Sequence, residues 1–196
     1  MSRVSGIPGA VLAGGQSRRM GTNKALMEVD GKPMIRLIAD SLKEVCNDVM
    51  IVGGNKDAYA TFGFPWYPDD VPDRGPLGGI YTALTRAGTD VLIAACDLPN
   101  VNSHLLRFLL SRYNSRESQT TILCSGSVIQ PLLGVYHPTC LPILHRFLKS
   151  GGRKVLEFLD QCTITFVDLE SAPHPFSPEM LLNLNTFVEY QSRISK

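Results

Sequence analysis

The apolar residues of this chain fall into short continuous runs that alternate with segments of helical spacing. Such runs lie in "GAVLAG", in "DVMIVGG" (residues 48–54) and in "DVLIAACDLP", where the run stops at Cys96-Asp97. Each run is followed by polar or glycine-rich sequence and then by a longer segment whose apolar residues recur every three or four positions. Continuous apolar runs, as opposed to alternating ones, are typical of strands buried on both faces of a parallel sheet. The pattern therefore predicts alternating strands and helices.

Three amphipathic helices are expected in the first part of the chain. One covers residues 34–45, another lies in "GGIYTALTRAG" and ends at Gly88, and a third lies in "NSHLLRFLLSRY" behind a capping asparagine. Their spacing places one apolar stripe on each helix. These stripes would cover the two faces of the sheet.

The second half of the chain continues the alternation with one change. The strands "TTILC" and "PLLGVYH" flank the turn "SGS", which predicts a hairpin or a crossover at the sheet edge and hence a mixed sheet there. Helices are expected from about Pro138 to Lys149 and in "RKVLEFLDQ", and a strand in "TITFVDL". Thr186 and Glu189 have capping-box spacing for a last helix.

The predicted fold class is α/β, with a Rossmann-like three-layer α/β/α arrangement and a mostly parallel central sheet. The chain has 196 residues, of which 44% are hydrophobic, so it can bury one sizeable core. We find no internal repeat and no linker long enough to divide it. A single domain over residues 1–196 is expected.

Charge and cysteine usage exclude several classes of protein. The 19 Lys and Arg residues are balanced by 18 Asp and Glu residues and are mostly scattered, which argues against a nucleic-acid or membrane partner. No apolar run approaches the roughly 20 residues of a membrane span, and the N-terminal sequence does not resemble a signal peptide, so a cytoplasmic location is expected. The five cysteines lack CxxC spacing, and the four histidines lack ligand spacing.

The loop after the first strand, "AVLAGGQSRRMGTNKALM", carries the first candidate chemistry. Glycines after a parallel strand let backbone N–H groups approach an anion closely, and Arg18, Arg19 and Lys24 suit a polyphosphate. The loop matches neither the Walker A motif nor GxGxxG. The alternative interpretation is a solvated loop with incidental charges.

Asp97 is the second candidate. It follows the buried run "VLIAAC" directly and is therefore expected at the same sheet edge as the glycine loop, where its carboxylate would hold Mg²⁺ against phosphate oxygens. A single aspartate is adequate, because Mg²⁺ usually takes only one or two protein carboxylates. The alternative is a turn or helix-capping aspartate before Leu98-Pro99.

The segment "PDDVPDRGPLGGI" is the third candidate. Its glycines precede a helix and permit close approach of the backbone to a ligand, while its aspartates suit ribose or base donors. A plain turn is the alternative. The residues concerned are Gly75, Gly78, Gly79, Asp69, Asp70 and Asp73.

The run "LAGGQSRRMGTNKAL" closely resembles the signature of the nucleotidyltransferases that attach a nucleotide to molybdopterin, the molybdenum cofactor guanylyltransferases. The resemblance continues in the family's order through "DRGPLGGIYTAL", "CDLP", "QPLLGVY", "GGRKVLEFL" and "NLNT", over nearly the whole chain. It implies a nucleotide-diphospho-sugar-transferase-like fold. It also implies one nucleotidyltransferase domain, with a nucleotide-binding N-terminal part and a molybdopterin-binding C-terminal part.

The resemblance implies transfer of GMP from GTP to the terminal phosphate of molybdenum-molybdopterin, giving molybdopterin guanine dinucleotide and pyrophosphate. The implied partners are GTP, the molybdenum cofactor, other molybdenum cofactor biosynthesis proteins and apo-molybdoenzymes. Since an ionised phosphate is already a nucleophile, no protein nucleophile is needed. Catalysis then reduces to positioning and charge neutralisation.

The resemblance also assigns residues. Asp69, with Pro72 three positions later, matches a nucleotide-contacting aspartate of the family, and Asp70 is the alternative. The expected catalytic residues are Arg19, Lys24 and Asp97, with Asp97 as the Mg²⁺ ligand. The expected nucleotide-binding residues are Leu12, Ala13, Gly14, Gly15, Lys24, Asp69, Gly78 and Asp97.

The expected molybdopterin-binding residues are Arg153, Lys154, Asn183 and Asn185. The two cations would hold the phosphate of the second substrate, and the two asparagines would orient that substrate or the metal. The alternatives are helix-surface cations and turn asparagines. The chain departs from the family at two places. The family's asparagine after the second strand is replaced by Gly53 or Gly54, with Asn55 nearby, and Phe187 stands where proline is usual.

Three other functions are alternatives to this one. A cytidylyltransferase acting on molybdopterin or on a sugar or polyol phosphate tends to read "LAAG", so Gly14 favours guanine. A noncatalytic adaptor that binds GTP and molybdopterin has less need of both Lys24 and Asp97. A Rossmann oxidoreductase would require GxGxxG spacing.

Overall fold

The computed structural model describes residues 6–14, 23–173 and 176–184 of the chain. Its strands are β1 (Gly9–Leu12), β2 (Glu28–Val29), β3 (Lys32–Pro33), β4 (Val49–Val52), β5 (Trp66–Tyr67), β6 (Val91–Ala95), β7 (Thr120–Ser125), β8 (Val128–Tyr136) and β9 (Ile164–Asp168). Its helices are α1 (Met34–Lys43), α2 (Lys56–Tyr59), α3 (Pro76–Ala87), α4 (Ser103–Arg112), α5 (Cys140–Lys149) and α6 (Val155–Leu159), with short 3₁₀ helices η2 (Lys24–Leu26), η3 (Ala60–Phe62), η4 (Leu169–Ser171) and η5 (Pro178–Leu181).

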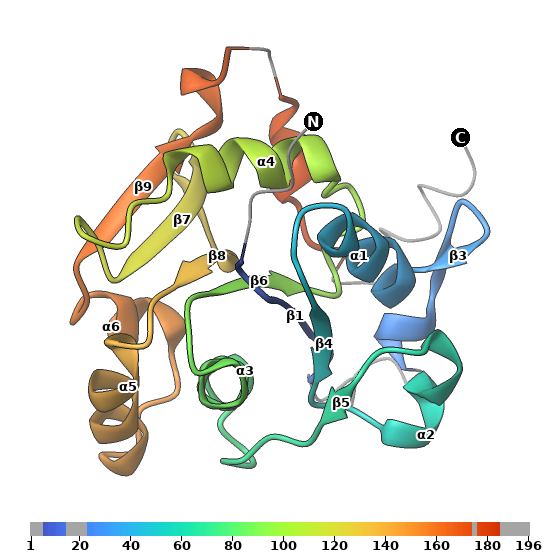
Figure 1. Ribbon diagram of the computed structural model, residues 1–196, viewed down its shortest axis with the longest axis horizontal. Helices are drawn as coiled ribbons and strands as arrows, with labels where there is room; N and C mark the ends of the chain where they lie inside the picture. Colours follow the sequence, from blue (N-terminus) through green and yellow to red (C-terminus); the bar gives the residue numbers. More distant parts are fainter. Residues whose placement is uncertain (1–5, 15–22, 174–175, 185–196) are drawn as a thin grey trace.

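Seven strands form one sheet in the order β5-β4-β1-β6-β8-β7-β9, and β2 and β3 form a separate small hairpin (Figure 1). β8 pairs antiparallel with both of its neighbours, whereas the other neighbouring strands of the sheet are parallel. α1 and α4 cover one face of the sheet, and α3, α5 and α6 cover the other (Figure 1). The predicted three-layer α/β/α fold with a mostly parallel sheet is therefore confirmed.

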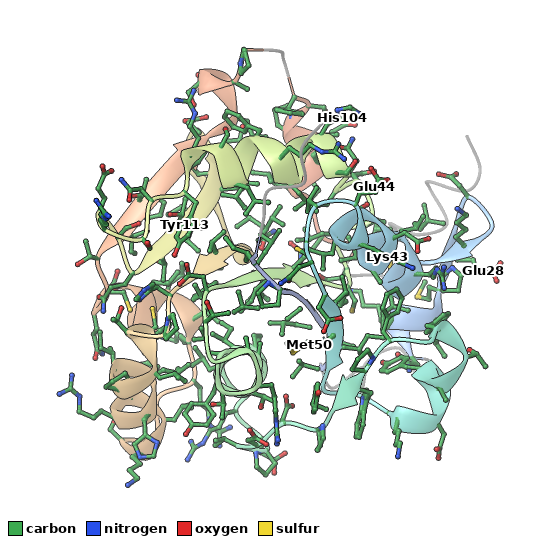
Figure 2. All side chains as sticks on the ribbon, viewed as in Figure 1. Glu28, Lys43, Glu44, Met50, His104 and Tyr113 are labelled. Carbon is green, nitrogen blue, oxygen red and sulfur yellow. The ribbon has the colours of Figure 1, made fainter. Side chains whose placement is uncertain are left out.

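Alternate side chains of the central strands enter two separate cores. In β1, Val11 packs in the core with α1 and α4, whereas Ala10 and Leu12 pack in the core with α3. Figure 2 shows Met50 of β4 on the α3 side of the sheet and Glu44 where α1 meets α4. Because both faces are buried, the central strands carry apolar residues at every position, which explains their continuous apolar runs.

The order of the strands reverses at β1. After β1 the chain adds β4 and then β5 on one side, and it then crosses back to place β6 on the other side of β1. In an open α/β sheet, such a reversal leaves a crevice outside the carboxyl ends of the strands, where ligands bind. The residues that follow β1 and β6 are therefore the first place to look for a site.

The structure confirms the strands expected in "GAVLAG", "DVMIVGG" and "DVLIAACDLP" and the helix that ends at Gly88, whose φ is 63°. It also confirms a hairpin of β7 and β8 and the mixed sheet that follows from it. The apolar pattern does not predict β5 or α2, because elements of two to four residues are too short to show a period. The last helix, expected from Thr186, lies outside the described residues.

Among the described residues, no helix is both long enough and apolar enough to cross a membrane. All five cysteines are free, and three of them are buried. Burial raises the pKa of the Cys46 thiol to about 12, so this thiol stays protonated at neutral pH, as suits a packing residue.

A prediction follows from the packing of β8. Gly134 lies opposite Ile93 of β6 and Ile122 of β7, and a Cβ atom on Gly134 would lie 2.5 Å from Ile122 Cδ1 and 2.6 Å from the carbonyl oxygen of Thr121. We expect Gly134→Ala to destabilise the protein by about 1–3 kcal/mol through overpacking. In the control Gly126→Ala the new methyl group meets open space, and only the positive φ of 55° costs about 1 kcal/mol. Equal melting temperatures for the two variants would contradict the prediction.

Candidate functional site

Directly after β1, the backbone of the chain packs against the backbone that follows β4. Ala13 N donates to Val52 O at 2.9 Å, which extends the pairing of β1 with β4 by one residue. The next residue, Gly14, lies directly against Gly53, and a Cβ atom on Gly53 would lie 2.9 Å from Gly14 Cα. Gly53 also has a φ of 80°, a conformation that favours glycine. The carboxyl ends of β1 and β4 therefore meet with no side chain between them.

The Asp69 carboxyl group lies beside this contact. A Cβ atom on Gly14 would lie 3.3 Å from Asp69 Oδ2, and one on Gly79 would lie 3.7 Å from Asp69 Oδ1. Asp69 Oδ1 is buried and accepts no hydrogen bond from the described residues. Burial raises the pKa of Asp69, and the neighbouring charge of Asp70 raises it further. A buried acceptor of this kind is typical of a site that receives a donor from a ligand.

Asp70 has a different role from Asp69. Its carboxylate forms an ion pair with Arg86 of α3, and its backbone N–H donates to Thr82 Oγ1 at 2.8 Å. Asp70 thus holds the loop onto α3. Of the two aspartates that the sequence leaves open, the structure brings Asp69 to the glycine contact.

The start of α3 packs tightly against the same loop at Gly78. A Cβ atom on Gly78 would lie 2.6 Å from Val71 O and 3.7 Å from Asp69 Cγ. Pro76 occupies the first turn of the helix, where its missing N–H costs no intrahelical hydrogen bond. Gly78 therefore permits the close packing that holds the Asp69 loop in place.

Lys24 and Asp97 meet across the crevice. Lys24 lies in η2, whose capping residue Asn23 accepts from Ala25 N and is hydrogen-bonded to the Tyr59 hydroxyl. Lys24 Nζ lies 3.0 Å from Asp97 Oδ2, and the two side chains are only 18% and 20% exposed. Partial burial reduces screening by water, so this ion pair is stronger than one on the open surface.

The other oxygen of Asp97 is held by the C-terminal part of the chain. Asn183 Nδ2 donates to Asp97 Oδ1 at 2.7 Å, and Leu184 N donates to Asp97 O at 2.9 Å. Gln130 Nε2 in turn donates to Asn183 Oδ1 at 2.7 Å and to Leu181 O at 2.9 Å. The carboxylate therefore accepts from a different side chain at each oxygen.

The Asp97 carboxylate suits a Mg²⁺ ion that also binds the phosphates of a substrate. Within the described part of the chain, no three His, Cys, Asp or Glu side chains gather as a metal cluster. Mg²⁺ commonly binds through one or two carboxylates and completes its shell with water and phosphate oxygens. Asp97 Oδ2 faces the Lys24 ammonium group, so its surroundings accommodate a positive charge. The Asp97 carboxylate therefore fits the ion, with phosphate needed to complete the set.

The predicted molybdopterin residues separate into two groups. Asn183 joins the hydrogen bonds around Asp97, whereas Arg153 and Lys154 are exposed residues between α5 and α6. Lys154 pairs with Glu157 at 2.7 Å, which raises the pKa of Lys154. Neither cation joins the network around Asp97 within the described residues.

Arg153 and Lys154 follow the end of α5, so the direction of α5 indicates the side of the sheet on which they lie. α5 begins at the opposite edge of the sheet, where Cys140 Sγ donates to the carbonyl oxygen of Gln119, just before β7. His145, in the second turn, has its ring 6.1 Å from that of Tyr81 in α3. The end of α5 therefore points back toward the edge where β6 ends.

Four of the expected site residues lie outside the described residues: Gly15, Arg18, Arg19 and Asn185. The structure describes the others, and it brings eight of them to the carboxyl edge of the sheet. These eight are Leu12, Ala13, Gly14, Lys24, Asp69, Gly78, Asp97 and Asn183.

The sequence analysis does not assign a role to Gln130, and it gives Gly53 only as a departure from the asparagine of the family. Gln130 is 6% exposed and lies in an apolar strand. Two signals could have identified it: a polar residue in such a run, and its place at the start of the family segment "QPLLGVY". Gly53 supplies the contact with Gly14, and its carbonyl oxygen accepts from Trp66 Nε1 at 2.8 Å. Asn55 caps α2 by accepting from two backbone N–H groups.

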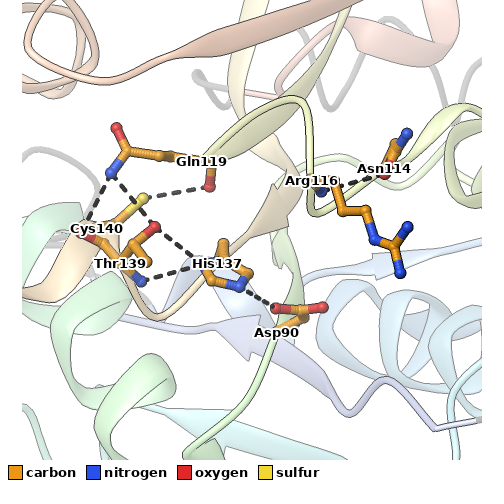
Figure 3. Close-up of polar contacts among 7 residues, drawn as sticks. All are labelled: Asp90, Asn114, Arg116, Gln119, His137, Thr139 and Cys140. Atoms are coloured by element: carbon orange, nitrogen blue, oxygen red, sulfur yellow. Dashed lines mark hydrogen bonds and ion pairs between the residues drawn. The ribbon is translucent and has the colours of Figure 1, made fainter.

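A second polar cluster lies at the opposite edge of the sheet (Figure 3). His137 Nε2 lies 3.5 Å from Asp90, which immediately precedes β6, and His137 Nδ1 lies 2.8 Å from Thr139 Oγ1. Gln119 Nε2 donates to Thr139, and Gln119 Oε1 accepts from Thr163 N. These contacts tie β6, β7 and β9 to the start of α5, away from the crevice.

Comparisons with known proteins show the family of the chain. Residues 9–163 match the model of the MobA-like NTP transferase domain. The chain is 35% identical over 184 residues to a probable molybdenum cofactor guanylyltransferase of Carboxydothermus hydrogenoformans, covering 93% of this chain and 92% of that one. It is 36% identical over 182 residues to the molybdenum cofactor guanylyltransferase of Vibrio campbellii, covering 90% and 89% of the two chains.

The fold has a counterpart among solved structures. The crystal structure of molybdopterin-guanine dinucleotide biosynthesis protein A from Archaeoglobus fulgidus superposes with a TM-score of 0.80 and 23% identity, over 95% of this chain and 96% of that one. This likeness concerns the fold, and the family model supplies the family. The chain belongs to the family of MobA-like NTP transferases.

Proposed function

We propose that this protein transfers GMP from GTP to the terminal phosphate of molybdenum-molybdopterin, forming molybdopterin guanine dinucleotide and pyrophosphate. The observation that carries the proposal is the meeting of Lys24 and Asp97 at the crevice between β1 and β6. A cation for phosphate and a carboxylate for Mg²⁺ are what nucleotidyl transfer requires there. The names of the relatives supply the nucleotide and the acceptor.

Asp69 is proposed to bind the guanine base. Guanine presents a ring N–H and an exocyclic amino group on one edge, and a carboxylate can accept from both. Asp69 Oδ1 is buried and accepts from none of the described residues, so it is available for such a donor. Gly14 leaves the other oxygen uncovered, because a methyl group there would lie 3.3 Å from Asp69 Oδ2.

The phosphates are proposed to lie over the glycine loop. Backbone N–H groups of the loop and the Lys24 ammonium group would hold the triphosphate. Arg19 would neutralise the charge that develops on the departing pyrophosphate. Asp97 would hold Mg²⁺, which when bound neutralises phosphate charge and makes the α-phosphorus easier to attack.

The bond changes need no protein nucleophile. An oxygen of the acceptor phosphate attacks the α-phosphorus, and the bond from that phosphorus to the bridging oxygen of the β-phosphate breaks as pyrophosphate leaves. The protein aligns the two phosphates and balances their charge. Asn183 and Asn185 are proposed to orient the molybdopterin, and Arg153 and Lys154 to hold its phosphate.

We also expect a cytoplasmic location and contacts with other molybdenum cofactor biosynthesis proteins and apo-molybdoenzymes. A cytidylyltransferase remains the second candidate, and Gly14 is the observation that weighs against it. An alanine there, as in "LAAG", would crowd the Asp69 carboxylate.

The catalytic assignment predicts the behaviour of two variants. Lys24→Ala removes the cation from the phosphates, and Asp97→Asn removes the charge that holds Mg²⁺. We expect each to lower kcat/KM for pyrophosphate release by about 100-fold or more, because charge stabilisation acts mainly in the transition state. Rates measured with GTP, molybdopterin and Mg²⁺ check this.

Asp40→Asn is the matched control for Asp97→Asn. Asp40 also forms an ion pair, with Arg36 at 2.9 Å, but on the exposed surface of α1. Its variant should keep the rate of the unaltered protein within about 2-fold, since exposed pairs contribute about 1 kcal/mol or less. An Asp97→Asn rate equal to that of the control would refute the assignment.

Asp69→Asn should stabilise the protein while weakening GTP binding. The raised pKa of Asp69 means that its ionised form costs stability, and this cost appears as the pH rises through the unfolded-state pKa. We therefore expect a melting temperature higher by on the order of a few degrees at pH 7 and a gain that vanishes in acid. GTP affinity should fall by at least about 10-fold, as for a lost hydrogen bond to a charged group.

The control is Asp70→Asn, which breaks the ion pair with Arg86 and should give no stabilisation. Thermal unfolding without nucleotide and titration with GTP measure the two effects. If Asp69→Asn binds GTP as tightly as the unaltered protein, Asp69 does not contact the nucleotide.

A further inference from the structure

Gln130 occupies an irregular part of β8. Ile122 of β7 pairs with Gly134, but Cys124, only two residues later, pairs with Ile129, so β8 carries additional residues between these pairs. Gln130 lies in this irregular segment and is buried, with 6% of its surface exposed. Such irregularities often redirect a side chain beside a functional site.

The hydrogen bonds of Gln130 can run in only one direction. Leu181 O is a carbonyl and can only accept, so Gln130 must present its NH₂ group there. The same NH₂ group donates to Asn183 Oδ1, which leaves Asn183 Nδ2 to face Asp97 and donate to Oδ1. The Lys24 ammonium group, which can only donate, holds Oδ2 at the other end. The polarity of the whole network is therefore set.

Gln130 reinforces this polarity from the far side of Asn183. A carboxamide can rotate by 180°, and a rotated Asn183 would turn its own oxygen toward the Asp97 carboxylate, where two acceptors repel. Gln130 opposes this rotation, because a rotated Asn183 would also turn its NH₂ group toward the NH₂ group of Gln130. The anchor at Leu181 O keeps Gln130 itself from rotating.

We propose that Gln130 is a positioning residue that acts through Asn183 to keep Asp97 Oδ1 occupied, so that the metal ion binds at Oδ2, the oxygen that faces Lys24. The inference rests on the proposed function, because that function gives Asp97 its Mg²⁺. A purely structural Gln130 would fasten the segment from Leu181 to Leu184 to β8 and affect stability only. The two roles differ in whether Mg²⁺ binding depends on Gln130.

The probe is Mg²⁺ with GTP, observed through Trp66. Trp66 is the single tryptophan of the chain, and its Nε1 donates to the carbonyl oxygen of Gly53, which touches Gly14 beside Asp69. Its fluorescence should therefore report GTP binding. We would measure the dissociation constant of GTP with Mg²⁺ and with EDTA; their ratio is the tightening caused by Mg²⁺.

Gln130→Met removes both donors at nearly unchanged volume, and Gln130→Glu replaces them by acceptors. Residues that orient a metal ligand typically change metal affinity by about 10–100-fold. We therefore expect the Mg²⁺ tightening to fall by about 10-fold in Gln130→Met and further in Gln130→Glu. GTP affinity in EDTA should change little.

Gln119→Met is the matched control. Gln119 also bonds to neighbouring backbone through its carboxamide, but at the opposite edge of the same sheet (Figure 3). This variant should lose stability, measured by thermal unfolding, and keep the full Mg²⁺ tightening. An equal loss of tightening in Gln119→Met would overturn the proposal, because the effect would then be a general consequence of destabilisation.

Asn183→Ala completes the test and keeps it valid if the Gln130 variants do not fold. It leaves Gln130 anchored at Leu181 O but removes the donor to Asp97. We expect the same loss of tightening, and Gln130→Met combined with Asn183→Ala should be no worse than Asn183→Ala alone. Unchanged tightening in Asn183→Ala, or additive losses in the double variant, would overturn the proposal.

The failure of the proposed function has a different signature. If Mg²⁺ does not tighten GTP binding in the unaltered protein, then the metal role of Asp97 is wrong, and the inference falls with it. If Mg²⁺ tightens binding there and equally in both Gln130 variants, then only the role of Gln130 is wrong.

Discussion

The ion pair between Lys24 and Asp97 joins residues that follow two strands far apart in the sequence. Lys24 follows β1, and Asp97 follows β6, which the chain reaches only after completing β4 and β5 on the other side. Parallel pairing of β1 with β6 brings the two residues to one edge. Because both side chains are four-fifths buried, their charges interact strongly. The distance between the two charged groups depends on the register of β1 with β6. A site with both a cation and a carboxylate for polyphosphate follows from this one contact.

A second group at the same edge, the Asp69 carboxylate, lowers the stability of the fold. Asp69 keeps a buried oxygen without a donor from the described residues, and burial raises its pKa. The contact between Gly14 and Gly53 leaves room for this carboxylate, since a side chain on either glycine would crowd it. Functional sites commonly carry such destabilising groups, because the group that lowers stability is the group that binds the ligand.

The sequence predicted most of the layered fold and the meeting of Lys24 with Asp97, because continuous apolar runs define buried parallel strands and such strands end at a common edge. It could not choose between Asp69 and Asp70, since that choice depends on the ion pair of Asp70 with Arg86 across the α3 contact. It also missed Gln130. This residue lies in an irregular part of the pairing of β8 and bonds to Asn183, and pairing irregularities leave no periodic signal in a sequence. Gly53, a departure from the family pattern, is explained by a backbone contact that only the fold reveals.

The most direct test of this account is pyrophosphate release by the purified protein with Mg²⁺, comparing GTP, CTP and ATP, each with and without molybdopterin. The account predicts release with GTP that requires molybdopterin, and much slower release with the other two nucleotides. Faster release with CTP would assign the protein to cytidylyl transfer, and tight GTP binding with no release in the presence of molybdopterin would contradict catalysis at the Lys24 and Asp97 site.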